Sequence, residues 1–205
     1  MVVFVGDLVA KGPYSKEVLD IARSMPRVYG VRGNHDHYVI MHQTKDSHPD
    51  SEHMKLARDD LGDDNLAWLE KLPFTLHIEQ YDVLVVHAGI VPGCSVQSNS
   101  VDNMIHMRNV LPDGTATSKA NEGVPWLDDY EGPSHCVFGH DAVRGLQVHP
   151  RATGLDTGCV YGNMLSCLMI PQWEIAQVPA REIYVAPLKP MREQSDDDVP
   201  AAVSA

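Results

Sequence analysis

The stretch Val31-Arg32-Gly33-Asn34-His35-Asp36 joins the end of an apolar run to a turn that carries an amide, an imidazole and a carboxylate. Short apolar runs rich in valine and phenylalanine are typical of buried strands. At a strand end the last side chain can point into a cleft, and an adjacent glycine lets the backbone turn sharply. This stretch therefore predicts a β-strand followed by a turn that presents polar side chains to a site.

Three other stretches are built in the same way. Each is a short apolar run that ends in one side chain able to bind a metal, next to a glycine: Val2 to Asp7, Val83 to Gly89 and Val137 to Asp141. We therefore expect one rim of the fold to bring together four ligands, namely Asp7, Asn34, His87 and His140. A set of oxygen and nitrogen ligands suits a hard or borderline divalent metal such as Mn, Fe, Zn or Mg.

The size and charge of the chain exclude some functions. Its 205 residues, 43% of them hydrophobic, suffice for one globular domain with a core. The formal net charge of −12 argues against binding to DNA or to an anionic membrane, which normally needs a basic face. It does not argue against a phosphate substrate, because bound metal ions supply local positive charge. We expect a domain over residues 1–190 and a disordered acidic tail over residues 191–205.

The cysteines and the N-terminus indicate where the protein resides. The four cysteines form no CxxC pair, so we expect free and mostly buried thiols in a reducing compartment, the cytoplasm. No apolar run is long enough to cross a bilayer, and the first residues form a core-type strand rather than a signal peptide. We also expect a monomer.

The order of the predicted elements indicates a mixed α/β fold. Strands over residues 2–5 and 28–31 flank a helix that Ser15 can cap and Pro26 ends, so they form a parallel βαβ unit. Runs over residues 74–78 and 83–86 predict a hairpin. The polar segment 43–60 is interpreted as a surface excursion, partly helical near residues 54–57. Later strands over residues 136–138, 146–149, 154–158 and 165–170 have no helix between them and are predicted to be antiparallel.

Taken in order, the motifs also carry a resemblance. They are GDLVAKGP at residues 6–13, RGNHD at 32–36, HAG at 87–89, FGHD at 138–141 and LDTGCVYG at 155–162. This set resembles the calcineurin-like metallophosphoesterases, and within them the ApaH-like branch of the phosphoprotein phosphatase family, named after bacterial diadenosine tetraphosphatase. The resemblance extends to about Val185. It implies a four-layer α/β/β/α sandwich of two mixed sheets.

The resemblance also implies roles for single residues. Asp7 would bridge two divalent metals, and Asn34, His87 and His140 would complete the second metal's ligands. His35 would be the catalytic imidazole, donating a proton to the leaving oxygen or stabilising negative charge there. Two cations about 3.5–4 Å apart would activate water for hydrolysis of a phosphate ester or anhydride.

The chain departs from the wider family at Ala10-Lys11, where protein phosphatases have Asp-Arg. Alanine cannot orient an imidazole, and lysine is a point charge rather than a two-pronged phosphate ligand. This disfavours a protein Ser/Thr phosphatase and favours a dinucleoside polyphosphate, a capped nucleotide or inorganic polyphosphate as substrate. Asp36 could orient the imidazole instead, or could serve as a charge at a helix N-terminus. Lys11, Arg108 and Arg144 are candidate phosphate ligands. For the two arginines, structural ion pairing is the alternative.

The second departure concerns the strand that ends in the family's GDxHG loop, whose Asp and His hold the first metal. No such motif precedes Asp7, so we expect an N-terminally truncated form with the first strand missing, or a natural variant that lacks one metal site. The function predicted is an ApaH-like phosphohydrolase. A catalytically impaired binding or regulatory module is the alternative from another class.

Overall fold

The computed structural model describes residues 1–41 and 51–186. Its helices are α1 (Ser15–Ser24), α2 (Asn34–Met41), α3 (Ser51–Leu61), α4 (Asp63–Glu70) and α5 (Val101–His106). Its strands are β1 (Val2–Phe4), β2 (Val28–Gly30), β3 (Thr75–Ile78), β4 (Val83–Val86), β5 (Asn109–Val110), β6 (Ala116–Thr117), β7 (Val124–Pro125), β8 (His135–Phe138), β9 (Gln147–His149), β10 (Ala152–Gly154), β11 (Met164–Met169) and β12 (Glu174–Pro179).

The central layer is a five-stranded mixed sheet with the order β3-β4-β8-β10-β9. The predicted hairpin β3–β4 is antiparallel, and β4 pairs parallel with β8. The prediction that the later strands are all antiparallel is wrong, because β10 pairs parallel with β8. After β8 the chain forms β9 at the edge of the sheet and then returns as β10, which lies between β8 and β9. Because β10 is antiparallel to β9, it runs in the same direction as β8.

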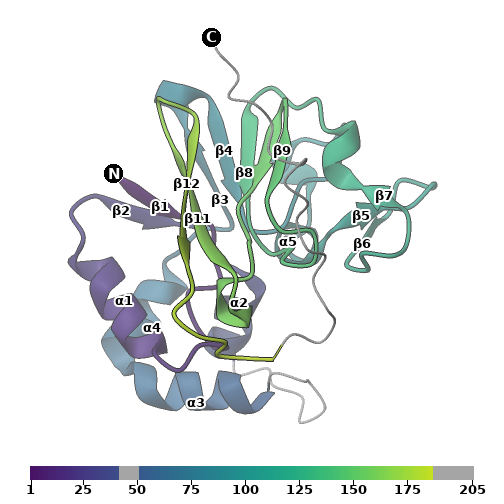
Figure 1. Ribbon diagram of the computed structural model, residues 1–205. Helices are drawn as coiled ribbons and strands as arrows, with labels where there is room; N and C mark the ends of the chain where they lie inside the picture. Colours follow the sequence, from purple (N-terminus) through teal and green to yellow (C-terminus); the bar gives the residue numbers. More distant parts are fainter. Residues whose placement is uncertain (42–50, 187–205) are drawn as a thin grey trace.

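A second sheet layer consists of two strand pairs. The predicted βαβ unit is confirmed, since β1 and β2 are parallel with Val2 opposite Val28. β11 and β12 form an antiparallel hairpin that lies in front of the five-stranded sheet in Figure 1. Both pairs cover the same face of the sheet, because side chains from each pack in one core with residues of the five-stranded sheet. This core contains Val3 of β1, the nearby Val5, Leu168 and Ile170 from the hairpin, and Val83, Val85 and Val137 from the sheet.

Two outer layers complete the sandwich. Helices α1, α3 and α4 gather on one side, whereas α5 and the small sheet β6-β5-β7 lie on the other (Figure 1). The small sheet consists of three two-residue strands that lie between α5 and β8 in the chain. On that side Trp126 and Met107 pack against Phe138 and Val86 of the central sheet. The predicted four-layer α/β/β/α architecture is therefore confirmed, although the second β layer is divided into two pairs.

The segment predicted to be a surface excursion contributes to the core. Its described part forms α3, whose Met54, Ala57 and Leu61 are buried in a cluster with Leu19 of α1 and Leu69 of α4. These three residues follow helical spacing, so one face of a polar helix is apolar. Residues 42–50 and the predicted tail lie outside the described residues.

Two further expectations concern thiols and membranes. All four cysteines are free, but only Cys136 is buried, so the expectation of mostly buried thiols is wrong. In the part of the chain that the structure describes, no helix has both the length and the hydrophobicity to span a bilayer.

Substituting one buried and one exposed leucine of α3 tests the packing of this helix. Leu61 is 2% exposed and Leu56 is 60% exposed, so the same substitution should have a large effect at Leu61 and a small one at Leu56. Leu61→Ala should lower the free energy of unfolding by about 2–5 kcal/mol through cavity formation, and Leu56→Ala should change it by less than about 0.5 kcal/mol. Urea denaturation measures both, and equal effects would contradict the packing described.

Candidate metal centre

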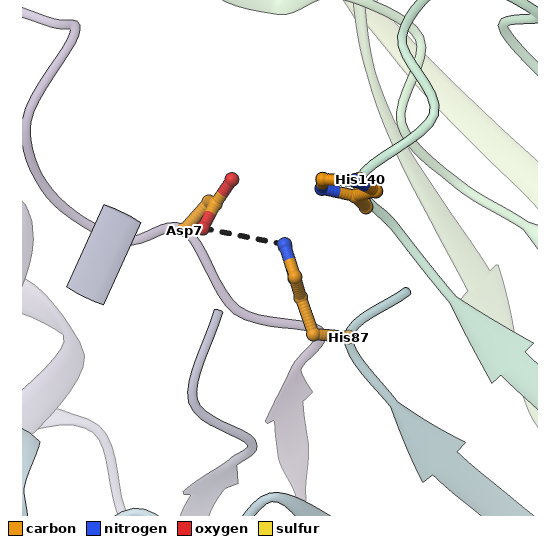
Figure 2. Close-up of side chains that lie close together, drawn as sticks. All are labelled: Asp7, His87 and His140. Carbon is orange, nitrogen blue, oxygen red and sulfur yellow. Dashed lines mark ion pairs between the residues drawn. The ribbon is translucent and has the colours of Figure 1, made fainter. Parts of the chain in front are cut away.

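The metal ligands predicted from separate motifs lie together. Asp7, His87 and His140 follow β1, β4 and β8, and one ligand atom from each lies within 4.8 Å of the others. Figure 2 shows the three side chains pointing toward one another, with an ion pair of 3.3 Å between Asp7 Oδ1 and His87 Nε2. Asn34 Oδ1 lies 3.0 Å from both His87 Nε2 and His140 Nδ1. Both sheet layers therefore contribute to one cluster.

The outer hydrogen bonds of the two histidines fix their orientation. His87 Nδ1 lies 2.7 Å from the carbonyl oxygen of Val5, and His140 Nε2 lies 3.1 Å from that of His106. A carbonyl oxygen can only accept, so these two nitrogens carry protons. When both rings are neutral, the lone pairs of the opposite nitrogens therefore face the Asn34 oxygen. Several electron-pair donors that face one another beside a carboxylate fit a divalent cation.

Burial and neighbouring charges prepare these groups to bind a cation. Burial by itself would raise the pKa of Asp7, but positive charge on His87 and His35 brings this pKa below its ordinary range. Burial and the neighbouring His87 hold the pKa of His140 well below 6.5. Burial opposes protonation of His87 too, yet the Asp7 carboxylate raises the pKa of that ring. A metal ion therefore competes mainly with a proton on His87.

Glycines next to the ligands allow the loops to approach one another. A Cβ atom on Gly33 would lie 2.1 Å from Asp7 Oδ1 and 2.4 Å from the Asp7 nitrogen. One on Gly6, which has a φ of +95°, would lie 2.5 Å from His87 Nδ1. The ligands Asp7 and His140 themselves have φ values of 55° and 65°, an uncommon conformation for residues with a Cβ that is typical of functional turns.

Asp36 has a role that the sequence interpretation did not include. Its Oδ2 accepts hydrogen bonds from the backbone N–H of Asp7 at 2.8 Å and of Gly33 at 2.9 Å. Its Oδ1 accepts from the N–H of Leu8 at 2.8 Å and of Val9 at 3.3 Å. Burial and the nearby Asp7 carboxylate raise the pKa of Asp36 to about 6. This carboxylate joins the loop that carries Asp7 to the turn that carries Asn34.

Ser15 and His35 also hold the loops around Asp7. Ser15 does not cap α1 as predicted, because Tyr14 precedes the helix without a side-chain cap. Instead the Ser15 hydroxyl accepts a hydrogen bond from the N–H of Ala10 at 3.1 Å. The candidate catalytic residue His35 is buried at the start of α2, and its backbone N–H donates to Asp7 Oδ1 at 3.0 Å.

Two of the candidate phosphate ligands take part in internal ion pairs. Arg144 pairs with Asp141 and donates to Asn109 Oδ1 at 2.6 Å. Arg108 Nε lies 3.4 Å from Asp141 Oδ1, and its Nη2 donates to the carbonyl oxygen of His140 at 3.2 Å. This geometry supports the structural alternative for both arginines, and contact with a phosphate stays a prediction.

The third candidate, Lys11, lies beside an aromatic ring. Its Nζ donates to the Tyr161 hydroxyl at 2.7 Å and lies 5.3 Å from the centre of that ring. Tyr161 comes from the LDTGCVYG motif, so this motif and the loop after β1 meet at Lys11. No local pattern in the sequence indicates this pair, because 150 residues separate the two partners.

Comparisons with known proteins agree with this geometry. The family model of calcineurin-like phosphoesterases matches residues 1–163, so the chain belongs to this family of phosphoester and phosphoanhydride hydrolases. It is similar to "Bis(5'-nucleosyl)-tetraphosphatase PrpE [asymmetrical]" of Oceanobacillus iheyensis, with 24% identity over 90% of this chain and 80% of the relative. It is similar to "Bis(5'-nucleosyl)-tetraphosphatase, symmetrical" of Coxiella burnetii, with 28% identity over 87% of this chain and 81% of the relative.

A solved structure is similar as well. It is named "Crystal structure of a putative diadenosine tetraphosphatase", and it has 37% sequence identity and a TM-score of 0.77. The likeness covers 87% of this chain and 79% of that chain.

Two glycine substitutions test the requirement for close approach. Gly33→Ala should weaken divalent metal binding by at least about tenfold, because the new Cβ displaces Asp7, and second-sphere changes of this kind cost about 10–100-fold in metal affinity. Gly12→Ala is the matched control, since a Cβ there meets nothing within 4 Å. Isothermal titration with Mn²⁺ measures both affinities. An unchanged affinity in the Gly33 variant would show that Gly33 does not shape the centre.

The proton on His87 predicts how metal binding depends on pH. The folded chain raises the pKa of this ring above 6.5, so at acidic pH a proton occupies the nitrogen that faces Asp7. The apparent Kd for Mn²⁺ should therefore fall as the pH rises through this pKa and level off above it. Titrations in buffers of different ionisation enthalpy should show proton release on binding in the falling range. A pH-independent Kd with no released proton would contradict this.

Proposed function

We propose that this chain is a metal-dependent phosphohydrolase that cleaves phosphoanhydride bonds of dinucleoside polyphosphates. The observation that carries the proposal is the convergence of Asp7, Asn34, His87 and His140, with both histidine tautomers set by backbone carbonyls. The tetraphosphatase names of the relatives support the substrate class.

The residues of the site would have separate roles in the reaction. Asp7, Asn34, His87 and His140 would hold a divalent ion, which supplies an activated water and neutralises phosphoryl oxygens. His35 is anchored next to them through its backbone bond to Asp7, and its imidazole would donate a proton to the leaving oxygen. The Asp36 carboxylate would keep both loops in place, so the reacting groups need no reorganisation.

The surroundings of Lys11 support a polyphosphate substrate over a phosphoprotein. Ala10 offers no side-chain acceptor, and the Lys11 ammonium is held by the Tyr161 hydroxyl as a single point of charge. Such a charge suits one anionic oxygen along a chain of phosphates rather than bidentate capture of a terminal phosphate. Capped nucleotides and inorganic polyphosphate share this chemistry and belong in the same test.

A second candidate function is a binding or regulatory module with impaired catalysis. The observation that favours it is that residues 1–41 and 51–186 contain one cluster of metal-binding side chains, whereas the family resemblance implies two metals. Metal content discriminates between the candidates: two ions per chain favour the hydrolase, and none or one without turnover favours the module.

The test is hydrolysis by the metal-loaded chain of diadenosine tetraphosphate, inorganic tripolyphosphate and a phosphoserine peptide. We expect Mn²⁺-dependent release of nucleotide from the first, loss of activity with EDTA, and little release of phosphate from the peptide. Mutating His35 separates catalysis from metal binding. His35→Ala should lower kcat by about 10²–10⁴-fold, the usual contribution of a general acid, with metal affinity retained.

A matched histidine serves as the control. His77 pairs with Leu84 near the start of β4, whereas His87 follows the end of this strand. His77 therefore lies at the far end of the hairpin from the metal centre. His77→Ala should leave kcat near the wild-type value. Turnover of the peptide alone, or equal kcat in the His35 variant and the wild type, would contradict the proposed function.

A further inference from the structure

A polar pocket of about 410 Å³ lies beside the metal centre. Its lining includes Tyr38, Asp102, Asn103, His106, Thr117 and Ser118. Pockets that bind small ligands have volumes of about 300–1,000 Å³ and a few convergent polar groups. Neither the metal site nor the motifs in the sequence account for this pocket.

The pocket and the metal centre share their walls. Tyr38 lies one helical turn after the candidate ligand Asn34 on α2, so the two are on the same face of this helix. The carbonyl oxygen of His106 accepts the hydrogen bond from His140 at 3.1 Å, and the His106 and His140 rings are 6.5 Å apart. A substrate that is bound at the metal centre would therefore need only a few bonds to reach the pocket.

The side chains of the pocket form a hydrogen-bonded row. The Tyr38 hydroxyl lies 2.5 Å from His106 Nε2, and His106 Nδ1 lies 2.8 Å from Asp102 Oδ1. The Tyr38 and His106 rings are tilted by 31° at 5.5 Å, so they offer neighbouring aromatic surfaces. Asp102 is 82% exposed at the mouth of the pocket. Aromatic surface combined with exposed hydrogen-bonding groups suits a nucleoside, whose base stacks and whose ribose hydroxyls donate.

The charges are arranged in the order that such a substrate requires. The Arg108 guanidinium lies between the two sites, because it donates to the carbonyl oxygen of His140 and, at 2.9 Å, to that of the pocket residue Ser118. Beyond it the exposed Asp102 carboxylate repels phosphate. The direction from the metal outward is thus cationic and then anionic, which matches a phosphate chain that ends in an uncharged nucleoside.

We propose that this pocket binds one nucleoside of the substrate and so selects dinucleoside polyphosphates over inorganic polyphosphate. The role of this pocket in substrate selection rests on the proposed function. Binding of a nucleoside to the pocket is a separate event that needs neither metal nor turnover.

The first experiment measures this binding without catalysis. Saturation-transfer NMR with adenosine and the metal-free chain should show transfer to base and ribose protons. Ser118→Phe should abolish this signal, because the exposed Ser118 lines the pocket and a phenyl ring fills it. The matched control is Ser24→Phe on the exposed end of α1, where the signal should persist. Absence of signal in the wild type, or its persistence in the Ser118 variant, would overturn the assignment.

The second experiment measures selectivity. In Asp102→Ala, the ratio of kcat/KM for diadenosine tetraphosphate to that for inorganic tripolyphosphate should fall about tenfold, equivalent to about 1.4 kcal/mol. Asp64→Ala, which removes another exposed carboxylate on α4, should leave the ratio unchanged. Equal losses for both substrates would overturn the proposal, since Asp102 would then act through His106 on the metal ligand. If the wild type hydrolyses neither compound, the proposed function fails while the adenosine experiment still decides the pocket.

Discussion

The arrangement of the site depends on one buried carboxylate. Asp36 accepts four backbone N–H groups from two loops that are far apart in the sequence. An ionised carboxylate with several N–H donors forms strong, directional bonds, and the donors would otherwise be buried without partners. Because two of these N–H groups belong to Asp7 and Gly33, the same interaction fixes the distance between the loop of Asp7 and the turn of Asn34.

This constraint acts together with the layering of the fold. Asp7 and Asn34 follow strands of the β1–β2 pair, whereas His87 and His140 follow strands of the central sheet. A cation held by all four would therefore join two layers that are also in contact through apolar side chains such as Val3, Val85 and Val137 and through the hydrogen bond between His87 and the Val5 carbonyl oxygen. Any ligand that binds only the folded chain stabilises it by mass action, so occupancy of the centre and packing of the two layers are thermodynamically linked.

Local patterns in the sequence were enough to predict the strands that end at the site, because each apolar run and its glycine are contiguous. They also predicted that Asp7, Asn34, His87 and His140 lie together, since each of them follows a strand within a few residues, and their role as metal ligands stays a prediction. The burial of α3 was missed because charged residues outnumber its three buried apolar residues, although Met54, Ala57 and Leu61 do follow helical spacing. The direction of β10, the Lys11–Tyr161 pair and the bonds from the N–H groups of residues 7–9 to Asp36 arise from long-range packing. No short window of sequence contains both partners of such contacts.

The electrostatics of the site explain how an acidic chain can bind a polyanion. The formal net charge is −12, and the Asp141 carboxylate partly neutralises Arg108 and Arg144, so these arginines and Lys11 supply only limited positive charge at the site. Attraction for phosphate must then come mainly from bound cations, whose field is strong at close range and screened beyond about 8–10 Å in physiological salt. Distant parts of a substrate are beyond this range and have to be recognised by contact. A long phosphate chain would meet repulsion from the exposed Asp102 carboxylate, whereas an uncharged base and ribose can bind next to it without repulsion. The negative charge of the chain therefore acts as a selectivity element, because it restricts favourable binding to molecules whose charge is confined to the segment at the metal.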